Sequence, residues 1–185
     1  FDDVQNRPSI LTPSGLIYRY DVYKSYFKST ISATYIKKYC PNFSPRTFPP
    51  TAKEIFVKFV EAHRKGDASG IAFHSTDELF VNVKDELENL KAKKMSFRIG
   101  FEINRFLRPI FILQMRHIFD KNAKKGWGQV TCQFVTERKV LKINHLNRVI
   151  DEKENVVSGI TIGVFEMCFH DPKRQWRLAM LHEIG

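Results

Sequence analysis

Apolar and polar side chains alternate strictly between residues 95 and 104. The apolar members of this run are Met95, Phe97, Ile99, Phe101 and Ile103. A repeat of two places alternate side chains on opposite faces of a β-strand, so these five are expected on the core side. Arg98 is then expected on the solvent face. Whatever its topology, the fold must contain a sheet with one buried face.

Further strands are expected after this one, joined by turns. We place them at residues 110–119, 126–142, 156–170 and 175–183, with turns at residues 121–125 and 170–173. Residues 160–165 are apolar on both faces, which predicts a central strand. Residues 144–148 are expected to form a hairpin turn in which Asn147 takes the left-handed conformation.

Three stretches with helical spacing of apolar residues precede the strands. They are expected at about residues 51–66, in a short stretch after residue 67, and at residues 75–90. Thr51 and Asp67 are expected N-caps, Gly66 ends the first helix, and Ser75 with Glu78 forms a capping box for the third. Helices followed by antiparallel strands predict an α+β domain with the helices packed on one face of the sheet.

The first 40 residues have a different composition from the rest of the chain. They contain all six tyrosines, interleaved with basic residues such as Arg19, Lys24 and Lys28, and their apolar periodicity is poor. We predict an extended N-terminal arm over residues 1–40, with a short helix over residues 31–39, ahead of one domain over residues 41–185. Such an arm would gain its order from a partner, either RNA or protein.

The net charge of +10 favours a polyanionic partner, RNA or an anionic membrane surface. The excess positive charge is concentrated in residues 91–125, which contain ten basic residues and only two acidic ones, Glu102 and Asp120. Solvated surface lysines would be the simplest explanation, but the clustering and the basic arm favour phosphate binding. The candidate RNA-binding residues are Lys91, Lys93, Lys94, Arg98, Arg105, Arg108, Lys121, Lys124 and Lys125, with Arg19, Lys24 and Lys28 from the arm.

Several site classes are disfavoured by residue spacing. The three cysteines show no CxxC pair and the six histidines no HxH or HxxxH pair, so we expect no metal and no cofactor. No apolar run approaches the roughly 20 residues of a membrane-spanning helix. Acid or base candidates on or beside the predicted strands are His117, Glu166, His170, Asp171 and His182. Their spacing does not demand catalysis, and we expect no enzyme activity.

Four segments carry a resemblance to a known family. They read YCPNFSPRTFPPTAKEIFVKFV from residue 39, MSFRIGFEINRFLRPIFIL from residue 95, GWGQVTCQFVTERKVLKI from residue 126 and QWRLAMLHEI from residue 175. Together they resemble the Tim forty-four-like domain family, which includes an inner-membrane translocase scaffold and a mitochondrial ribosomal branch. Asn42-Phe43, the segment from Gly126 to Val130, and Trp176-Arg177 are closer to the ribosomal branch. Asn147 departs from the family, which has glycine in this hairpin.

The resemblance implies a fold and a role. The family fold is a cone-shaped, curved antiparallel sheet whose concave face is covered by helices, as in nuclear transport factor and ketosteroid isomerase. The ribosomal branch implies a structural constituent of the mitochondrial large ribosomal subunit in the matrix, near the polypeptide exit tunnel and facing the inner membrane. Its partners would be ribosomal RNA, neighbouring proteins, and the inner membrane or its insertase, with no small-molecule substrate. The alternatives are a membrane-associated scaffold of the protein-import motor or a ribosome receptor and, third, a cone-fold enzyme.

Overall fold

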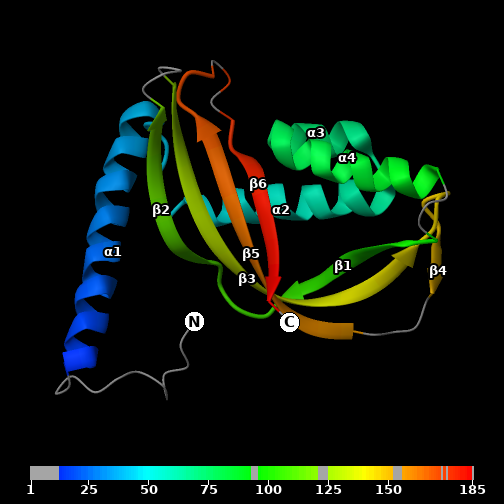
Figure 1. Cartoon of the computed structure of the whole chain (residues 1–185), viewed down its shortest axis with the longest axis horizontal. Coiled ribbons are helices and arrows are strands. Elements are labelled where there is room, and N and C mark those ends of the chain that lie inside the picture. Colours follow the sequence, from blue (N-terminus) through cyan, green and yellow to red (C-terminus); the bar gives the residue numbers. More distant parts are fainter. Residues whose placement is uncertain are drawn as a thin grey trace.

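A computed structural model describes residues 13–92, 96–120, 125–151, 156–171, 173 and 175–184. Within these residues, four helices precede six strands (Figure 1). The helices are α1 (Pro13–Tyr39), α2 (Phe48–Lys65), α3 (Ala68–His74) and α4 (Asp77–Lys91). The strands are β1 (Arg98–Phe106), β2 (Phe111–Asp120), β3 (Lys125–Ile143), β4 (Val149–Asp151), β5 (Val156–Cys168) and β6 (Arg177–Ile184). The predicted α+β class is confirmed.

Strand β3 is the spine of one antiparallel, visibly curved sheet (Figure 1). β5 pairs with one edge of β3 and also with β6, so the prediction of a central strand over residues 160–165 is confirmed. β2 and β1 both pair with the opposite edge, β2 with residues 125–133 and β1 with residues 136–143. Together β1 and β2 form one interrupted border of the sheet, which leaves the outer edge of β2 without a strand partner.

The three predicted helices are α2, α3 and α4, although two of their starts differ from expectation. Gly66 ends α2 at φ 66°, and the Asp67 side chain accepts hydrogen bonds from the first turn of α3, as predicted. α2 begins at Phe48 and not after Thr51, because prolines in its first turn need no N–H partner and already have a helical φ. The N-cap of α4 is Thr76. Ser75 is buried, and its hydroxyl donates to the Ile71 carbonyl at 2.7 Å.

Aromatic side chains join α2 to the sheet and form the centre of the core. Phe56 is fully buried and stacks on Phe134 of β3 with ring centroids 4.4 Å apart. Trp176, directly before β6, contacts Phe48 at the N-terminal end of α2, with ring centroids 4.7 Å apart. Phe59, Val130 and Trp176 are also buried, whereas Phe101, which was predicted on the core side, is half-buried at the border of the core.

The predicted faces of β1 are wrong at its beginning. Phe97 and Ile99 are 38% and 52% exposed, whereas Arg98 is only 1% exposed and Gly100 is buried. Paired residues of antiparallel strands lie on the same face, and Arg98 pairs with the buried Ile143. At this end of β1 the buried side of the strand is therefore the one that carries Arg98 and Gly100. Alternation along the strand separates the two sides but does not show which of them is buried.

The described part of the N-terminal arm is helical from Pro13 to Tyr39. The predicted helix over residues 31–39 is confirmed, whereas the expected extended conformation of residues 13–30 is wrong. α1 runs along β2 (Figure 1), and the Ser29 hydroxyl accepts a hydrogen bond from the Met115 backbone N–H at 3.3 Å. Ser32 lies 3.1 Å from the His117 ring nitrogen Nδ1, and Ile36 is fully buried in the main core. α1 thus covers a strand edge whose N–H groups would otherwise be open. A boundary at residue 40 would separate Ile36 from the core that buries it.

Candidate functional site

The sequence-predicted basic residues that the structure describes do not form a single patch. Lys93, Lys94, Lys121, Lys124 and the side chain of Arg19 lie outside the described residues. Of the others, Lys91 is exposed at the end of α4, Arg105 and Arg108 lie at the bend between β1 and β2, and Lys125 opens β3.

Strand pairing gives the scale of this separation. Arg105 lies opposite Glu137, twelve residues along β3 from Lys125. At the rise of a β-strand this is a path of about 40 Å. The basic residues are therefore distributed along the β1–β2 border of the sheet and its ends, where they could contact separate phosphates of a large polyanion but not a single small anion.

Arg105 and Arg108 differ in their freedom to bind phosphate. Arg105 donates from Nη2 to Glu137 Oε2 at 2.8 Å, and this hydrogen bond raises the pKa of the guanidinium. Arg108 is exposed and has no ion pair within the described part of the chain. The guanidinium of Arg108 is consequently freer than that of Arg105 to donate hydrogen bonds to a phosphate.

Arg98 cannot bind an external phosphate, so its expected role is wrong. Its Nη2 atom donates to the Arg64 carbonyl at 3.0 Å and to Asn147 Oδ1 at 3.2 Å. Burial lowers the pKa of Arg98, while the negative charge of Glu86 opposes this effect. The guanidinium therefore joins the end of α2 to the β3–β4 hairpin inside the protein.

The hairpin joined by Arg98 is part of a basic end that the sequence reasoning missed. Asn147 has φ 57°, as predicted, and lies against Gly66, where an added Cβ would be 2.5 Å from the amide oxygen of Asn147. This contact brings Arg148 of the hairpin to the same end of the domain as Lys65, which directly precedes Gly66, and both side chains are exposed. Apolar side chains are also exposed here, with Leu146 at 60% and Ile150 at 53%. Only the positive φ of Asn147 was readable in the sequence.

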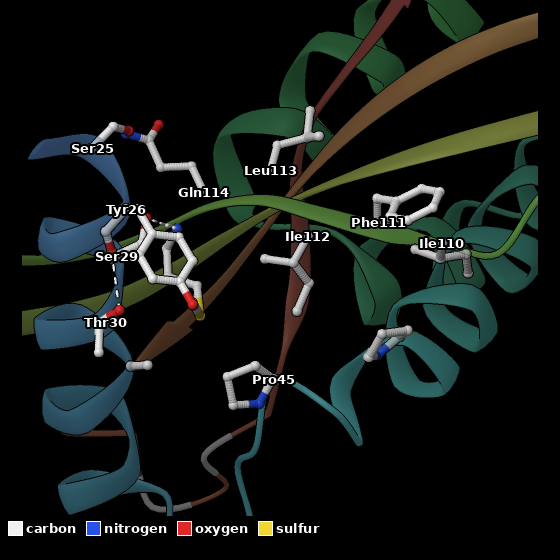
Figure 2. Close-up of a pocket in the computed structure, with 13 residues that line it drawn as sticks. Ser25, Tyr26, Ser29, Thr30, Pro45, Ile110, Phe111, Ile112, Leu113 and Gln114 are labelled. Carbon is white, nitrogen blue, oxygen red and sulfur yellow. Dashed lines mark hydrogen bonds between the residues drawn. The ribbon is translucent and has the colours of Figure 1, made fainter. Parts of the chain in front are cut away.

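A groove of about 750 Å³ lies between α1 and β2 (Figure 2). Tyr26 extends from α1 into it, opposite Ile112 of β2, and Pro45 closes its lower side in Figure 2. All of its described lining residues are uncharged; they are Ser25, Tyr26, Ser29, Thr30, Ala33, Pro45, Pro49 and residues 110–115. The groove is therefore unsuited to a phosphate group, and none of the candidate RNA-binding residues with a described side chain lines it.

A smaller apolar cavity of about 180 Å³ lies between α2, α4 and the sheet. Its polar lining residues are His63 and Glu183, and both have partners. His63 Nε2 lies 3.5 Å from Glu86 Oε2, and this hydrogen bond lowers the pKa of Glu86. Glu183 accepts two hydrogen bonds from the buried Arg138, at 2.8 and 3.2 Å.

The acid or base candidates predicted from sequence lie apart from this cavity. His117 stacks on Tyr35 of α1 with centroids 4.3 Å apart, and Glu166 accepts a hydrogen bond from Gln129 at 2.8 Å. His170 accepts from the Gly126 N–H at 3.3 Å, and His182 is exposed on β6. Glu166 and Asp171 both line a further pocket of about 320 Å³, together with Trp127 and Arg177. His117, His170 and His182 do not line this pocket, so the five candidates do not form one common site.

The described residues show no cluster of three or more side chains able to hold a metal ion. Cys40, Cys132 and Cys168 are free thiols, and burial raises the pKa of Cys132 to about 12, which keeps that thiol protonated and unreactive. No helix in the described ranges is long and apolar enough to cross a membrane.

Comparison with known proteins gives an informative relative. No protein-family model matches the chain. The chain is 25% identical over 173 residues to the large ribosomal subunit protein mL45 of Bos taurus. The alignment covers 93% of this chain and 54% of the bovine protein, so the chain spans about half the length of that relative. The similarity extends over nearly all of this chain, helices and sheet alike.

Proposed function

We propose that this chain is a structural, non-enzymatic component of the mitochondrial large ribosomal subunit. The observation that carries the proposal is the similarity to bovine mL45 over 93% of the chain. The resemblance to the ribosomal branch of the Tim forty-four-like family supports a position in the matrix near the exit tunnel and facing the inner membrane. In this role the chain would be held by ribosomal RNA and by neighbouring proteins.

The proposed RNA contacts lie along the β1–β2 border of the sheet. Arg108 and Lys125 are exposed and far apart, as suits a long polyanion whose phosphates repeat along its length. Lys91 is exposed at the end of α4. Lys93, Lys94, Lys121 and Lys124, which lie outside the described residues, are proposed to contribute further phosphate contacts. Contacts of this kind fix the position of a protein on RNA without reading sequence.

The proposed fold is the cone shared by nuclear transport factor and its relatives. Support comes from the curvature of the sheet and from the packing of α2 against it through Phe56 (Figure 1). In enzymes with such a cone, free acids and bases point into the cavity. Here His63 and Glu183 are held by Glu86 and Arg138, which favours a structural role.

A second candidate function is an inner-membrane-associated scaffold of protein import or a ribosome receptor. The observation that favours it is the basic end, where exposed Leu146 and Ile150 accompany Lys65 and Arg148. Apolar side chains flanked by basic ones suit the surface of an anionic bilayer. The same surface is compatible with a large subunit that touches the membrane.

Copurification distinguishes the two functions. Mitochondria are lysed, and one half of the lysate is sedimented through a high-salt gradient while the other is treated with nuclease and floated with the membranes. A ribosomal protein stays with large-subunit particles in the gradient. A chain that leaves the particles in salt and floats with nuclease-treated inner-membrane vesicles is a scaffold, and the ribosomal proposal is then wrong.

A second test addresses the RNA contacts themselves. Replacing Lys93, Lys94, Lys124 and Lys125 by Gln should weaken binding to a ribosomal RNA fragment and lower the slope of log K against log salt by about 0.7 to 0.9 for each phosphate that is no longer neutralised. The matched control is the replacement of Lys58 and Lys84 by Gln, since both lysines are paired with glutamates on their own helices. An unchanged slope in the quadruple variant would refute the assignment.

A further inference from the structure

The outward side of α1 carries a continuous stripe of large apolar side chains. Its members are Ile17, Tyr20, Tyr23, Phe27 and Ile31. Their spacing of three or four residues places them on one side of the helix. The side chains that α1 buries against the sheet, Ser29, Ser32 and Ile36, lie on the opposite side of the helix. We call the outward set the α1 stripe.

The side chains of the α1 stripe are large and apolar, yet most of their surface is exposed to solvent. Ile17, Tyr20 and Phe27 are 64%, 64% and 66% exposed, and Tyr23 is 68% exposed. Monomeric soluble proteins seldom expose contiguous apolar patches beyond a few hundred Å², and larger ones usually mark interaction surfaces. The stripe follows a helix already fixed to β2, so a partner would meet a preformed surface.

The chemistry of the stripe distinguishes between RNA and protein as the partner. Ile17 and Ile31, at its two ends, have no ring on which a base could stack. Lys24 places its Nζ atom 5.6 Å from the centroid of the Tyr20 ring, so a cation already occupies one face of that ring. Anchors at such helical spacing are typical of a helix that lies in the apolar groove of a protein.

The charges beside the stripe specify the rim of that groove. The sequence of α1 has basic residues at Arg19, Lys24, Lys28, Lys37 and Lys38, and Asp21 is its one acidic residue. The hydroxyls of Thr30 and Thr34 donate to carbonyls of α1 itself and need no external acceptor. The surface thus combines an apolar centre with a positive border, and charge complementarity requires acidic residues around the partner groove.

We propose that the α1 stripe docks into an apolar groove, rimmed by Asp and Glu, on a neighbouring protein. This inference rests on the proposed function, because that neighbour would be another protein of the large subunit. It assigns Lys24 and Lys28 to a protein contact, whereas the sequence alone assigned them to RNA.

Site-specific photocrosslinking in intact mitochondria tests the inference. The full chain carries p-benzoylphenylalanine in place of Phe27, in place of Tyr20, or, as the control, in place of Val81, which is 52% exposed on α4. After irradiation, each adduct is treated with nuclease or protease and identified by mass spectrometry. Positions 20 and 27 should give a nuclease-resistant adduct to the same protein, several-fold above position 81, through a segment that contains acidic and apolar residues.

A charge-reversal pair checks the proposed rim. Lys24→Glu with Lys28→Glu should reduce the adduct at position 27 several-fold, whereas Arg46→Glu with Lys173→Glu, both exposed and outside α1, should leave it unchanged. An adduct to RNA or to lipid, a yield equal to that at position 81, or equal effects of the two charge reversals would overturn the inference. Sedimentation of the unirradiated chain reports separately on the ribosomal proposal.

Discussion

Arg98→Met tests the conclusion that a buried guanidinium joins α2 to the β3–β4 hairpin. Arg98 is 1% exposed and donates to the Arg64 carbonyl and to Asn147 Oδ1. Methionine has a similar length and fills the space without a charge. The variant therefore removes the two hydrogen bonds and the cation at the C-terminal end of α2 while leaving the packing volume nearly intact.

Three contributions set the expected change in the free energy of unfolding. Hydrogen bonds from a charged donor contribute about 1.5 to 3 kcal/mol each, so removing the two bonds costs about 3 to 6 kcal/mol. Removing the cation at the end of α2 adds up to about 2 kcal/mol. In the opposite direction, the variant avoids the cost of burying a charged guanidinium on folding, which stabilises it by several kcal/mol. The exposed Asn147 can bond to water in the variant, and Nε and Nη1 of Arg98 have no partner among the described residues, so the main loss is that of the bond to the Arg64 carbonyl. We therefore expect a net loss of about 1 to 3 kcal/mol.

Urea unfolding of the purified chain measures this loss, provided that the m value stays unchanged. Arg105→Met on the same strand is the control, since its exposed pair with Glu137 should contribute only about 0.2 to 1 kcal/mol. Native Arg98→Met should also keep the salt dependence of RNA binding. A variant as stable as the parent, or one that loses RNA affinity without losing stability, would refute the reasoning.

Three further predictions concern the core, acid stability and α1. Phe56→Ala should lower the free energy of unfolding by about 3 to 5 kcal/mol, because the ring is fully buried, while Phe73→Ala, 59% exposed, should change it little. The hydrogen bond from His63 holds the pKa of Glu86 below its ordinary value of 4.5. The stability that Glu86 contributes is therefore present above pH 4.5 and is lost as the pH falls through the lowered pKa. Glu86→Gln should remove this loss, so the free energy of unfolding should fall less steeply at acid pH. Deleting residues 13–39 should lower the melting temperature and promote aggregation in light scattering, because the edge of β2 and the core around Ile36 are uncovered; an unchanged melting temperature would contradict the packing of α1.

Local sequence signals predicted the elements whose own residues determine them. Gly66 and Asp67 end one helix and begin the next because a left-handed glycine and a capping carboxylate act on adjacent backbone groups. Asn147 likewise takes its positive φ within the hairpin. Residues 160–165 are apolar on both faces because β5 lies inside the sheet.

The predictions from sequence were wrong where contacts with segments distant in the chain determine which residues are buried. α1 buries Ser29 and Ser32 against β2 and exposes Tyr20, Tyr23 and Phe27, so its apolar periodicity does not mark the packed side. Arg98 is buried because the end of α2 and the hairpin supply its two acceptors, neither of which is near it in sequence. The separation of Arg105 from Lys125 follows from the length of β3 and not from the spacing of charges.

A density map of the native mitochondrial large subunit is the most direct test of the proposed role. Density for the sheet and α1–α4 should be present in the particle, with RNA phosphates at Arg108 and Lys125 and with protein covering the outward side of α1. Arg98 should remain inside the chain, bonded to the end of α2. Absence of the chain from the salt-washed particle, or a bound chain whose Arg108 and Lys125 both face solvent, would contradict the account.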